Sequence, residues 1–397
     1  MANRRSSPSM HPRAASAPRS ALEERPVAEA EVSLNPLVAS LRPSATVRLT
    51  DTATRLRESG VDVVALAAGE PDAPTPAAVA AAGIEAITRG ITKYTPNSGT
   101  SALRAAIAAK LRSENGLAEV QDSWVVVSNG AKQAVWQAVQ ATCGPGDEVI
   151  VPAPYWVSYP EMARLAGAEP VVALARVVAR HPRLLVLSDE IYEYLVYPPA
   201  RHVSFGALPG MARRTLTVNG FSKAYSMTGW RLGYLAAPPP YAQVAAIIQS
   251  QTTSGASSIA QHAALAALGL GHGGGDPVAR AVAATRQKRD RVVARLRAIP
   301  GIKLATPPGA FYAFPDASAL VGPGVEAEGF GPVPDVAELC RYILECAHVV
   351  VVPGEAFGLP ECFRISYATD LEQLERGMDR IAAALAPNKL RRTHTAA

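Results

Sequence analysis

Residues 215–237, TLTVNGFSKAYSMTGWRLGYLAA, contain side chains that can do covalent chemistry. A β-prone run ends at Asn219-Gly220, a dipeptide that turns the chain. Lys223 follows among small and hydroxyl residues, and Arg231 comes eight positions later. A lysine can form a Schiff base with a carbonyl group, and an arginine can bind a phosphate. The stretch therefore predicts a site for a phosphorylated carbonyl cofactor, with a solvated loop lysine as the alternative.

A second stretch predicts an anion site. Residues 124–128 (WVVVS) are typical of a strand, and residues 131–142 carry apolar side chains at helical spacing. A strand that turns tightly into a helix directs free N–H groups, and the positive end of the helix dipole, at one point. We therefore expect Gly130, Ala131 and Lys132 to hold a phosphate, and a βα turn that binds nothing is the alternative.

An acid follows a third strand. The apolar run 183–187 predicts a buried strand that leads to Asp189. An acid at the carboxyl end of such a strand points into the crevice where open α/β sheets bind ligands, and when buried it must be paired. Pairing with a pyridinium N–H would make a pyridoxal ring an electron sink. Trp156, just past another predicted strand, could stack on such a ring, or it could belong to the core.

One arginine lies within an otherwise apolar and aromatic strand. The stretch CFRISYA, residues 362–368, contains Arg364. A guanidinium buried there needs an anion as its partner. A substrate carboxylate that accepts two parallel hydrogen bonds would fit, and an internal salt bridge is the alternative.

The segment FSKAYSMTGWR resembles the cofactor-binding segment of class I aminotransferases, which use pyridoxal 5'-phosphate (PLP). The resemblance implies that Lys223 carries PLP and that Arg231 binds its phosphate. It also implies that the N–H of Gly69, in AAGEPD, binds the α-carboxylate of the substrate, together with Arg364 in FRISYA. Motifs such as VSNGAKQ and PAPYWVSY are similar to a plastid branch of plants and algae that acts on aspartate, glutamate and prephenate.

The same resemblance assigns further roles. It implies that Trp156 stacks on PLP and that Tyr192 binds the phenolic oxygen of PLP. Tyr94 matches a tyrosine that reaches the partner's cofactor phosphate across a subunit interface, so an obligate homodimer is expected. Three residues match positions that bind acidic substrates: Thr46, Lys132 and Arg42, the last replacing a usual lysine.

The implied fold is α/β, the aspartate aminotransferase-like PLP fold type I. It consists of an αβα sandwich and a smaller α/β domain. We expect residues 1–32 to form a disordered tail and 33–75 an N-terminal arm with part of the small domain. Residues 76–280 would form the large PLP-binding domain and 281–397 the small C-terminal domain.

A family motif is absent. Members carry, before the strand that leads to Asp189, a further strand ending in NPTG, whose asparagine binds the phenolic oxygen of PLP. The sequence contains no NPTG. We therefore expect the large domain to be truncated near 172–175 and the central sheet to lack a strand, which leaves unpaired backbone groups. A catalytically impaired or inactive remnant is the alternative function.

Composition excludes several classes of protein. The 397 residues are 48% hydrophobic and 18% charged, which suits a soluble globular protein. No run approaches the roughly 18–20 apolar residues that span a bilayer. The net charge of +5 is small for 397 residues, so nucleic-acid binding is not expected. The four cysteines and seven histidines show no metal-binding spacing, so no metal is expected.

The predicted activity is transamination between acidic amino acids and oxoacids, namely 2-oxoglutarate, oxaloacetate and prephenate. A lyase or decarboxylase that uses the same cofactor is a rival. The Arg- and Ser-rich, acid-poor start of the chain favours a transit peptide and a location in the plastid stroma. An ordinary tail on a cytoplasmic protein is the alternative.

Overall fold

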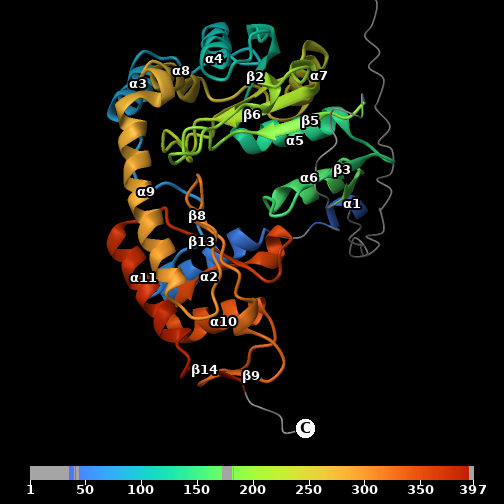
Figure 1. Ribbon diagram of the computed structural model, residues 1–397. Coiled ribbons are helices and arrows are strands. Elements are labelled where there is room, and N and C mark those ends of the chain that lie inside the picture. Colours follow the sequence, from blue (N-terminus) through green and yellow to red (C-terminus); the bar gives the residue numbers. More distant parts are fainter. Residues whose placement is uncertain (1–34, 40, 42–43, 172–180, 182, 393–397) are drawn as a thin grey trace, which may run out of the picture.

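The computed structural model describes residues 35–39, 41, 44–171, 181 and 183–392 (Figure 1). Its helices are α1 Pro36–Ala39, α2 Ala45–Glu58, α3 Ala77–Thr88, α4 Ser101–Glu114, α5 Ala131–Thr142, α6 Ser158–Leu165, α7 Pro239–Thr252, α8 Ser258–Leu268, α9 Gly275–Arg297, α10 Val336–Ala347 and α11 Leu371–Ala384. Its strands are β1 Val64–Ala65, β2 Val125–Ser128, β3 Glu148–Ile150, β4 Glu169–Val171, β5 Val186–Asp189, β6 Thr215–Gly220, β7 Gly233–Ala236, β8 Tyr312–Ala313, β9 Val325–Ala327, β10 Gly331–Pro332, β11 Val349–Val350, β12 Val352–Pro353, β13 Phe363–Ser366 and β14 Leu390–Arg392.

A four-stranded sheet in the order β2-β7-β6-β5 forms the centre of the larger unit. Strands β5 and β6 are parallel, whereas β7 runs antiparallel to both of its neighbours. Side chains alternate across the sheet. Val125 and Val127 pack with residues of α4 and α8 on one face, and Val126 packs with residues of α5 and α7 on the other. Helices therefore cover both faces, and the predicted αβα sandwich is confirmed.

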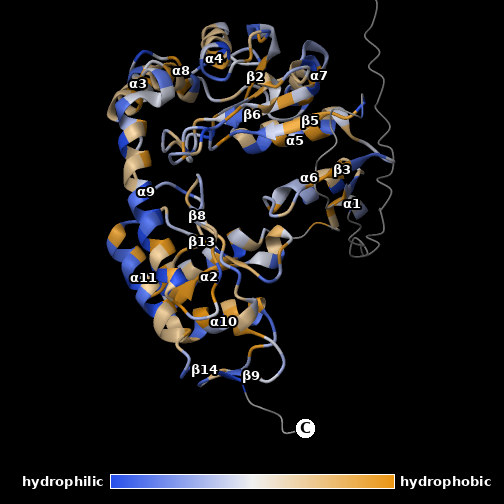
Figure 2. Ribbon diagram, in the orientation of Figure 1, coloured by the Kyte–Doolittle hydropathy of each residue, from blue (hydrophilic) through white to orange (hydrophobic). Residues whose placement is uncertain are grey.

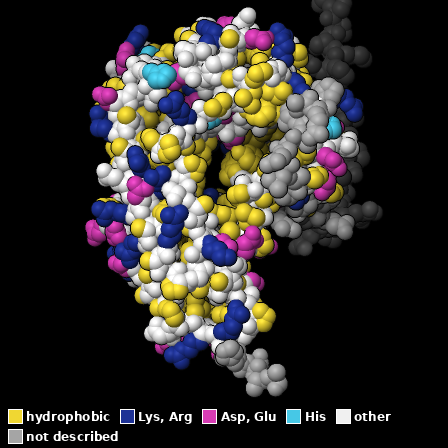
Figure 3. Space-filling view, in the orientation of Figure 1, with side chains coloured by type: hydrophobic (Ala, Val, Ile, Leu, Met, Phe, Trp, Pro, Cys, Tyr) yellow, Lys and Arg dark blue, Asp and Glu magenta, His cyan; other side chains and the backbone are white. Residues whose placement is uncertain are grey.

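A smaller α/β unit lies below this sandwich in Figure 1. It contains a sheet in the order β12-β13-β8, and β1 pairs with β11, so an early segment of the chain joins the C-terminal unit. Helix α9 connects the units, because Val278 packs in the core of the sandwich and Val292 in that of the smaller unit. Figure 2 shows hydrophilic and hydrophobic residues alternating along α9 and α11, and Figure 3 shows a hollow between the two units.

The sheet of the sandwich is interrupted beside β5. Strands β3 and β4 pair with each other in a separate two-stranded sheet, and β5 pairs only with β6 among the described strands. All four residues of β5 are half-exposed, whereas β6 is almost entirely buried. The buried strand predicted over 183–187 is therefore found over 186–189, and it is partly exposed because only one of its edges pairs with a described strand. The predicted loss of a strand stays a prediction, since residues 172–180 and 182, which connect β4 to β5, lie outside the described residues.

Two further elements differ from what their own sequence predicts. Thr50 and Asp51 are suitable N-cap residues and predict a helix start there, but α2 begins at Ala45. The Thr50 hydroxyl donates to the carbonyl of Thr46, one turn earlier, instead of capping a helix start. The strand expected over 61–68 is only Val64–Ala65, the part that pairs with β11. No helix within the described residues is both long enough and apolar enough to cross a membrane.

Candidate functional site

Two parallel strands position the side chains at the centre of the site, Asp189 and Lys223. Asp189 ends β5 opposite Val218 of β6, and Lys223 lies three residues beyond the end of β6. The carboxyl ends of parallel strands meet at one edge of a sheet. Asp189 and Lys223 therefore lie at the same end of the sheet, where the two parallel strands finish.

Lys223 is not a solvated loop lysine. Its Nζ donates a hydrogen bond of 2.5 Å to the carbonyl of Gly69 and lies 6.0 Å from the ring centre of Phe311. Burial lowers the pKa of Lys223 to about 8, and the positive charges of Arg231 and Arg364 also lower this pKa, against the opposing effect of the Glu70 carboxylate. An amine with such a pKa is available as a nucleophile and as a base near neutral pH.

The carboxylate of Asp189 lacks a cationic partner within the described residues. It accepts a hydrogen bond of 2.9 Å from the Tyr159 hydroxyl and one of 3.3 Å from the N–H of Ile191. The residue keeps some exposed surface at the open edge of β5, but its carboxylate is enclosed, and this burial raises the pKa of Asp189. An enclosed acid with hydrogen bonds but no cation is suited to a cationic ligand group.

Positively charged side chains lie beside the first turn of helix α5. Gly130 precedes its first residue with φ of 86°, a conformation that favours glycine. A Cβ atom on Gly130 would lie 2.5 Å from Nη2 of Arg231, so the backbone and the guanidinium approach closely. The Lys132 amine lies 5.3 Å from the ring centre of Trp156, and partial burial and the charge of Arg231 lower its pKa. The predicted residues of the anion site therefore converge.

Arg364 is the most unusual cation of the site. The residue is 8% exposed, and its guanidinium carbon lies 4.4 Å from the ring centre of Tyr312 and 4.7 Å from that of Phe357. Nη2 donates to the carbonyl of Ala67 at 2.7 Å, and Nε has no partner. No carboxylate of the described residues pairs with Arg364, so the internal salt bridge is absent. A buried cation without a counter-ion is expected to recruit an anionic ligand.

Gly69 contacts both Lys223 and Tyr312, the aromatic neighbour of Arg364. Its carbonyl accepts the Lys223 hydrogen bond, and a Cβ atom on Gly69 would lie 2.3 Å from Oη of Tyr312. A larger residue would displace that tyrosine. The Tyr312 hydroxyl in turn lies 3.0 Å from the hydroxyl of Tyr192.

Two predicted site residues make no hydrogen bond to this cluster, and a third lies outside the described residues. Tyr94, in the loop between α3 and α4, is 99% exposed, as an ordinary loop tyrosine would be. Thr46 lies in the first turn of α2, where its hydroxyl is 2.9 Å from that of Ser44. Arg42 lies outside the described residues.

Sequence reasoning missed Tyr159, Tyr312 and Phe357. Tyr159 is only three residues beyond Trp156, and the need of a buried acid for a donor could have singled it out. Tyr312 and Phe357 come from segments far from both strand ends, and an aromatic residue there is ordinary core by pattern. Their role depends on tertiary contacts alone.

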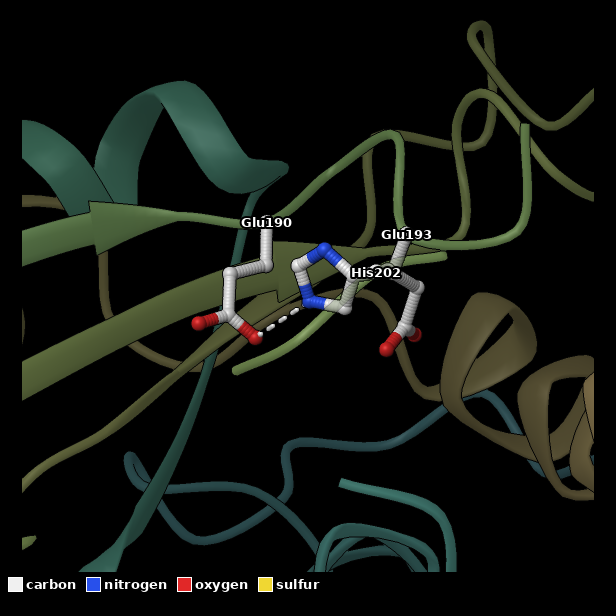
Figure 4. A group of neighbouring side chains, drawn as sticks. All are labelled: Glu190, Glu193 and His202. Carbon is white, nitrogen blue, oxygen red and sulfur yellow. Dashed lines mark hydrogen bonds and ion pairs between the residues drawn. The ribbon is translucent and has the colours of Figure 1, made fainter. Parts of the chain in front are cut away.

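A further cluster of ionisable groups follows β5 (Figure 4). Glu190, Glu193 and His202 present potential ligand atoms within 4.8 Å of one another, and Nε2 of His202 lies 3.1 Å from Oε2 of Glu190. Both carboxylates already have protein partners: Glu190 accepts hydrogen bonds from the Ser204 hydroxyl and Glu193 pairs with Lys110. The Glu190 carboxylate raises the pKa of His202. These contacts join the cluster into an internal polar network.

Comparison with known proteins gives consistent matches. A family model described as "Aminotransferase class I and II" matches residues 61–174 and 168–381. The "Bifunctional aspartate aminotransferase and glutamate/aspartate-prephenate aminotransferase" of Petunia hybrida is 51% identical over 403 aligned positions, which cover 90% of this chain and 84% of the relative.

Solved structures give the same result. The aspartate aminotransferase of Rhizobium meliloti superposes with a TM-score of 0.83 and 36% identity, over 91% of this chain and 100% of the other. The aspartate aminotransferase of Thermus thermophilus with maleate superposes with a TM-score of 0.81 and 37% identity, over 89% and 100% of the two chains.

Proposed function

The chain belongs to the aminotransferase class I and II family, and from this premise we propose that it transfers amino groups between acidic amino acids and oxoacids with PLP as its cofactor. One observation carries the proposal. A lysine whose pKa is lowered to about 8 is influenced by the charges of an enclosed carboxylate and a buried guanidinium, Asp189 and Arg364, and neither of these forms an ion pair within the described residues. These are the groups that a pyridinium nitrogen and a substrate carboxylate would complete.

The residues present fit PLP. Gly130, Ala131 and Lys132, at the start of α5, and Arg231 beside them would hold the phosphate through backbone N–H groups and positive charge. The Asp189 carboxylate would pair with the ring nitrogen. Two aromatic residues would complete the site: Trp156 would stack on the ring, and Tyr192 would donate to the phenolic oxygen. When bound, PLP supplies an electron sink for the carbanion formed at the substrate α-carbon.

The side chains of the protein divide the remaining work. The Lys223 amine would hold PLP, and it would remove and return the proton of the substrate α-carbon as a general base and acid. Arg364 and the N–H of Gly69 would bind the α-carboxylate, which orients that proton toward the amine. Lys132, Thr46 and Arg42 would bind the second carboxylate of an acidic substrate.

An assay with and without an oxoacid tests this function. The protein loaded with PLP is expected to convert aspartate to oxaloacetate at a steady rate only when 2-oxoglutarate is supplied, and prephenate is the second acceptor to compare. Steady turnover of aspartate without any oxoacid would favour the lyase or decarboxylase rival. The inactive-remnant alternative is not favoured by relatives that are named as aminotransferases.

Replacement of Arg364 by lysine should weaken substrate binding. Lysine keeps a positive charge but loses the planar pair of donors. Because a hydrogen bond to a charged group contributes roughly 1.5–3 kcal/mol, we expect KM for aspartate to rise about 10- to 100-fold. The measurement is steady-state kinetics. Arg341→Lys, on the exposed face of α10 beside Glu338, is the matched control and should leave KM unchanged. Equal KM values for both variants would exclude this role of Arg364.

The homodimer and the plastid location also belong to this proposal. Tyr94 is fully exposed in a single chain, which leaves it free to complete the phosphate site of a second copy. Analytical ultracentrifugation that finds a monomer would contradict this. A plastid location is supported by residues 1–22, which contain four arginines and no acidic residue, and by the plant relatives. Expression of the chain fused to a fluorescent protein would test it, and fluorescence outside plastids would contradict it.

The loss of one strand from the central sheet is likewise proposed. Strands β5 and β3 each have an edge without a described partner. The two family matches meet at residues 168–174, just before β5. The alignment with the petunia relative spans 403 positions but covers only 90% of the 397 residues, so some positions hold no residue of this chain.

A chimera tests the missing strand. Insertion after Val171 of the petunia residues that this chain lacks should pair the open edges and raise Tm by about 5 °C or more, since each kcal/mol shifts Tm of such a domain by roughly 2–4 °C. Thermal unfolding with PLP present gives the measurement. A Gly/Ser insertion of equal length is the control and should not raise Tm. If both insertions have the same effect, this chain lacks no strand.

A further inference from the structure

We propose that Tyr312 is a positioning residue, which holds Arg364 with its ring and Tyr192 with its hydroxyl. The inference rests on the proposed function, because it assigns Tyr312 a role toward the substrate carboxylate and the cofactor. Tyr312 belongs to β8 of the smaller unit, whereas Tyr192 follows β5 of the larger one. A single side chain therefore contacts functional groups of both units.

The ring of Tyr312 limits where the guanidinium of Arg364 can lie. Strand β8 pairs with β13, which carries Arg364, with Tyr312 opposite Ser366. The guanidinium carbon lies 4.4 Å from the ring centre of Tyr312, and Phe357 contacts it at 4.7 Å. Contact with two aromatic rings replaces part of the lost hydration of the cation, and it leaves Nε, which has no hydrogen-bond partner, available to an anion. Without the Tyr312 ring, one of these two contacts is lost.

The hydroxyl of Tyr312 limits the hydrogen bonding of Tyr192. The two hydroxyl oxygens are 3.0 Å apart, and burial raises the pKa of both tyrosines. Each hydroxyl has one proton to donate. When Tyr312 donates to Tyr192, the Tyr192 proton is free for a ligand, and the first bond strengthens the second. A ligand that accepts from Tyr192 selects this arrangement, in which the Tyr312 hydroxyl makes Tyr192 a better donor to the phenolic oxygen of PLP.

Gly69 also restricts the position of Tyr312, in addition to the contacts with Arg364 and Tyr192. A Cβ atom there would lie 2.3 Å from the Tyr312 oxygen, so the hydroxyl is seated against the backbone that also accepts the Lys223 hydrogen bond. The tyrosine cannot move toward Gly69. Its position is therefore set by the β8–β13 pairing and by this contact.

Two variants separate the functions of the ring and the hydroxyl. Tyr312→Phe keeps the ring, so the dissociation constant of maleate, measured by calorimetry without PLP, should stay within about 2-fold of wild type. The pH at which the absorbance of bound PLP changes should rise by about 0.5 unit, because a weaker donor to the phenolic oxygen favours its anionic form less. Tyr312→Leu removes both contacts, and the dissociation constant of maleate should rise roughly 3- to 30-fold.

The control is Tyr342→Phe, which removes a 3.0 Å hydrogen bond to the carbonyl of Ala384 in the same unit, away from the site. It should lower Tm without changing maleate binding or the absorbance transition. If Tyr312→Leu binds maleate as wild type does, the positioning role is overturned. If no PLP absorbance appears in wild type, the proposed function fails, while maleate binding without PLP still decides the role of Tyr312 toward Arg364.

Discussion

Lys223→Ala is expected to lower the rate of amino transfer by roughly 10²- to 10⁴-fold or more, because the positioned general acid–base is lost. The variant should also lose the covalent attachment of PLP. Other lysines near the site are committed elsewhere: Lys132 lies beside Trp156 at the start of α5, and Lys288 pairs with Asp72 at 2.5 Å.

Borohydride reduction of the PLP-loaded protein, followed by peptide mapping, measures the attachment directly. In wild type the label should lie on Lys223, and in Lys223→Ala it should be absent. Lys303→Ala, an exposed lysine of the smaller unit, is the matched control and should keep both label and activity. A label on any other lysine of wild type would contradict the assignment.

Asp189→Asn is expected to have opposite effects on activity and on the stability of the PLP-free protein. Asparagine can still accept the Tyr159 hydrogen bond but carries no charge. Loss of one member of a buried ion pair costs roughly 3–5 kcal/mol. We therefore expect the rate of amino transfer to fall about 10²- to 10³-fold, since each 1.36 kcal/mol corresponds to a factor of ten.

Without PLP, the same substitution removes an enclosed charge that has no cationic partner. Burial raises the pKa of Asp189 in the folded state, so the folded protein binds this proton more tightly than the unfolded chain does. The ionised group therefore destabilises the fold above that pKa, and the penalty disappears as pH falls below about 3.9, the ordinary value for aspartate. Tm of PLP-free Asp189→Asn should exceed that of wild type at pH 7, with the difference shrinking as the solution is acidified.

Thermal unfolding across pH, with and without PLP, provides the measurement. Tyr159→Phe is the matched control, because it keeps the charge and removes the hydrogen bond that favours it. That variant should be less stable than wild type at pH 7. A lower Tm for PLP-free Asp189→Asn than for wild type would show that Asp189 has a cationic partner in the folded chain.

The sequence pattern was sufficient to predict the parts of the site that follow from where strands end and helices begin. Asp189 and Lys223 each follow an apolar, β-prone run, and parallel strands bring their carboxyl ends to one edge. Gly130 to Lys132 form a strand-to-helix turn, whose donors point one way by helix geometry alone. These features depend only on residues that are close together in the sequence.

Contacts between distant segments could not be predicted in the same way. The sequence indicated that Arg364 needs an anion, but not that Tyr312 and Phe357 contact its guanidinium. It indicated an apolar strand before Asp189, but burial of a strand depends on which strands lie beside it, and β5 pairs with β6 alone among the described strands.

The amino-acid sequence by itself determined the α/β architecture, the lysine, the acid and the arginines, because residue type and short-range periodicity are properties of the chain. Only the tertiary structure decided which charges are unpaired, how far the pKa of Lys223 falls, and which tyrosines join the two units. Desolvation and packing depend on every atom around a group, and most of those atoms come from residues far away in the sequence.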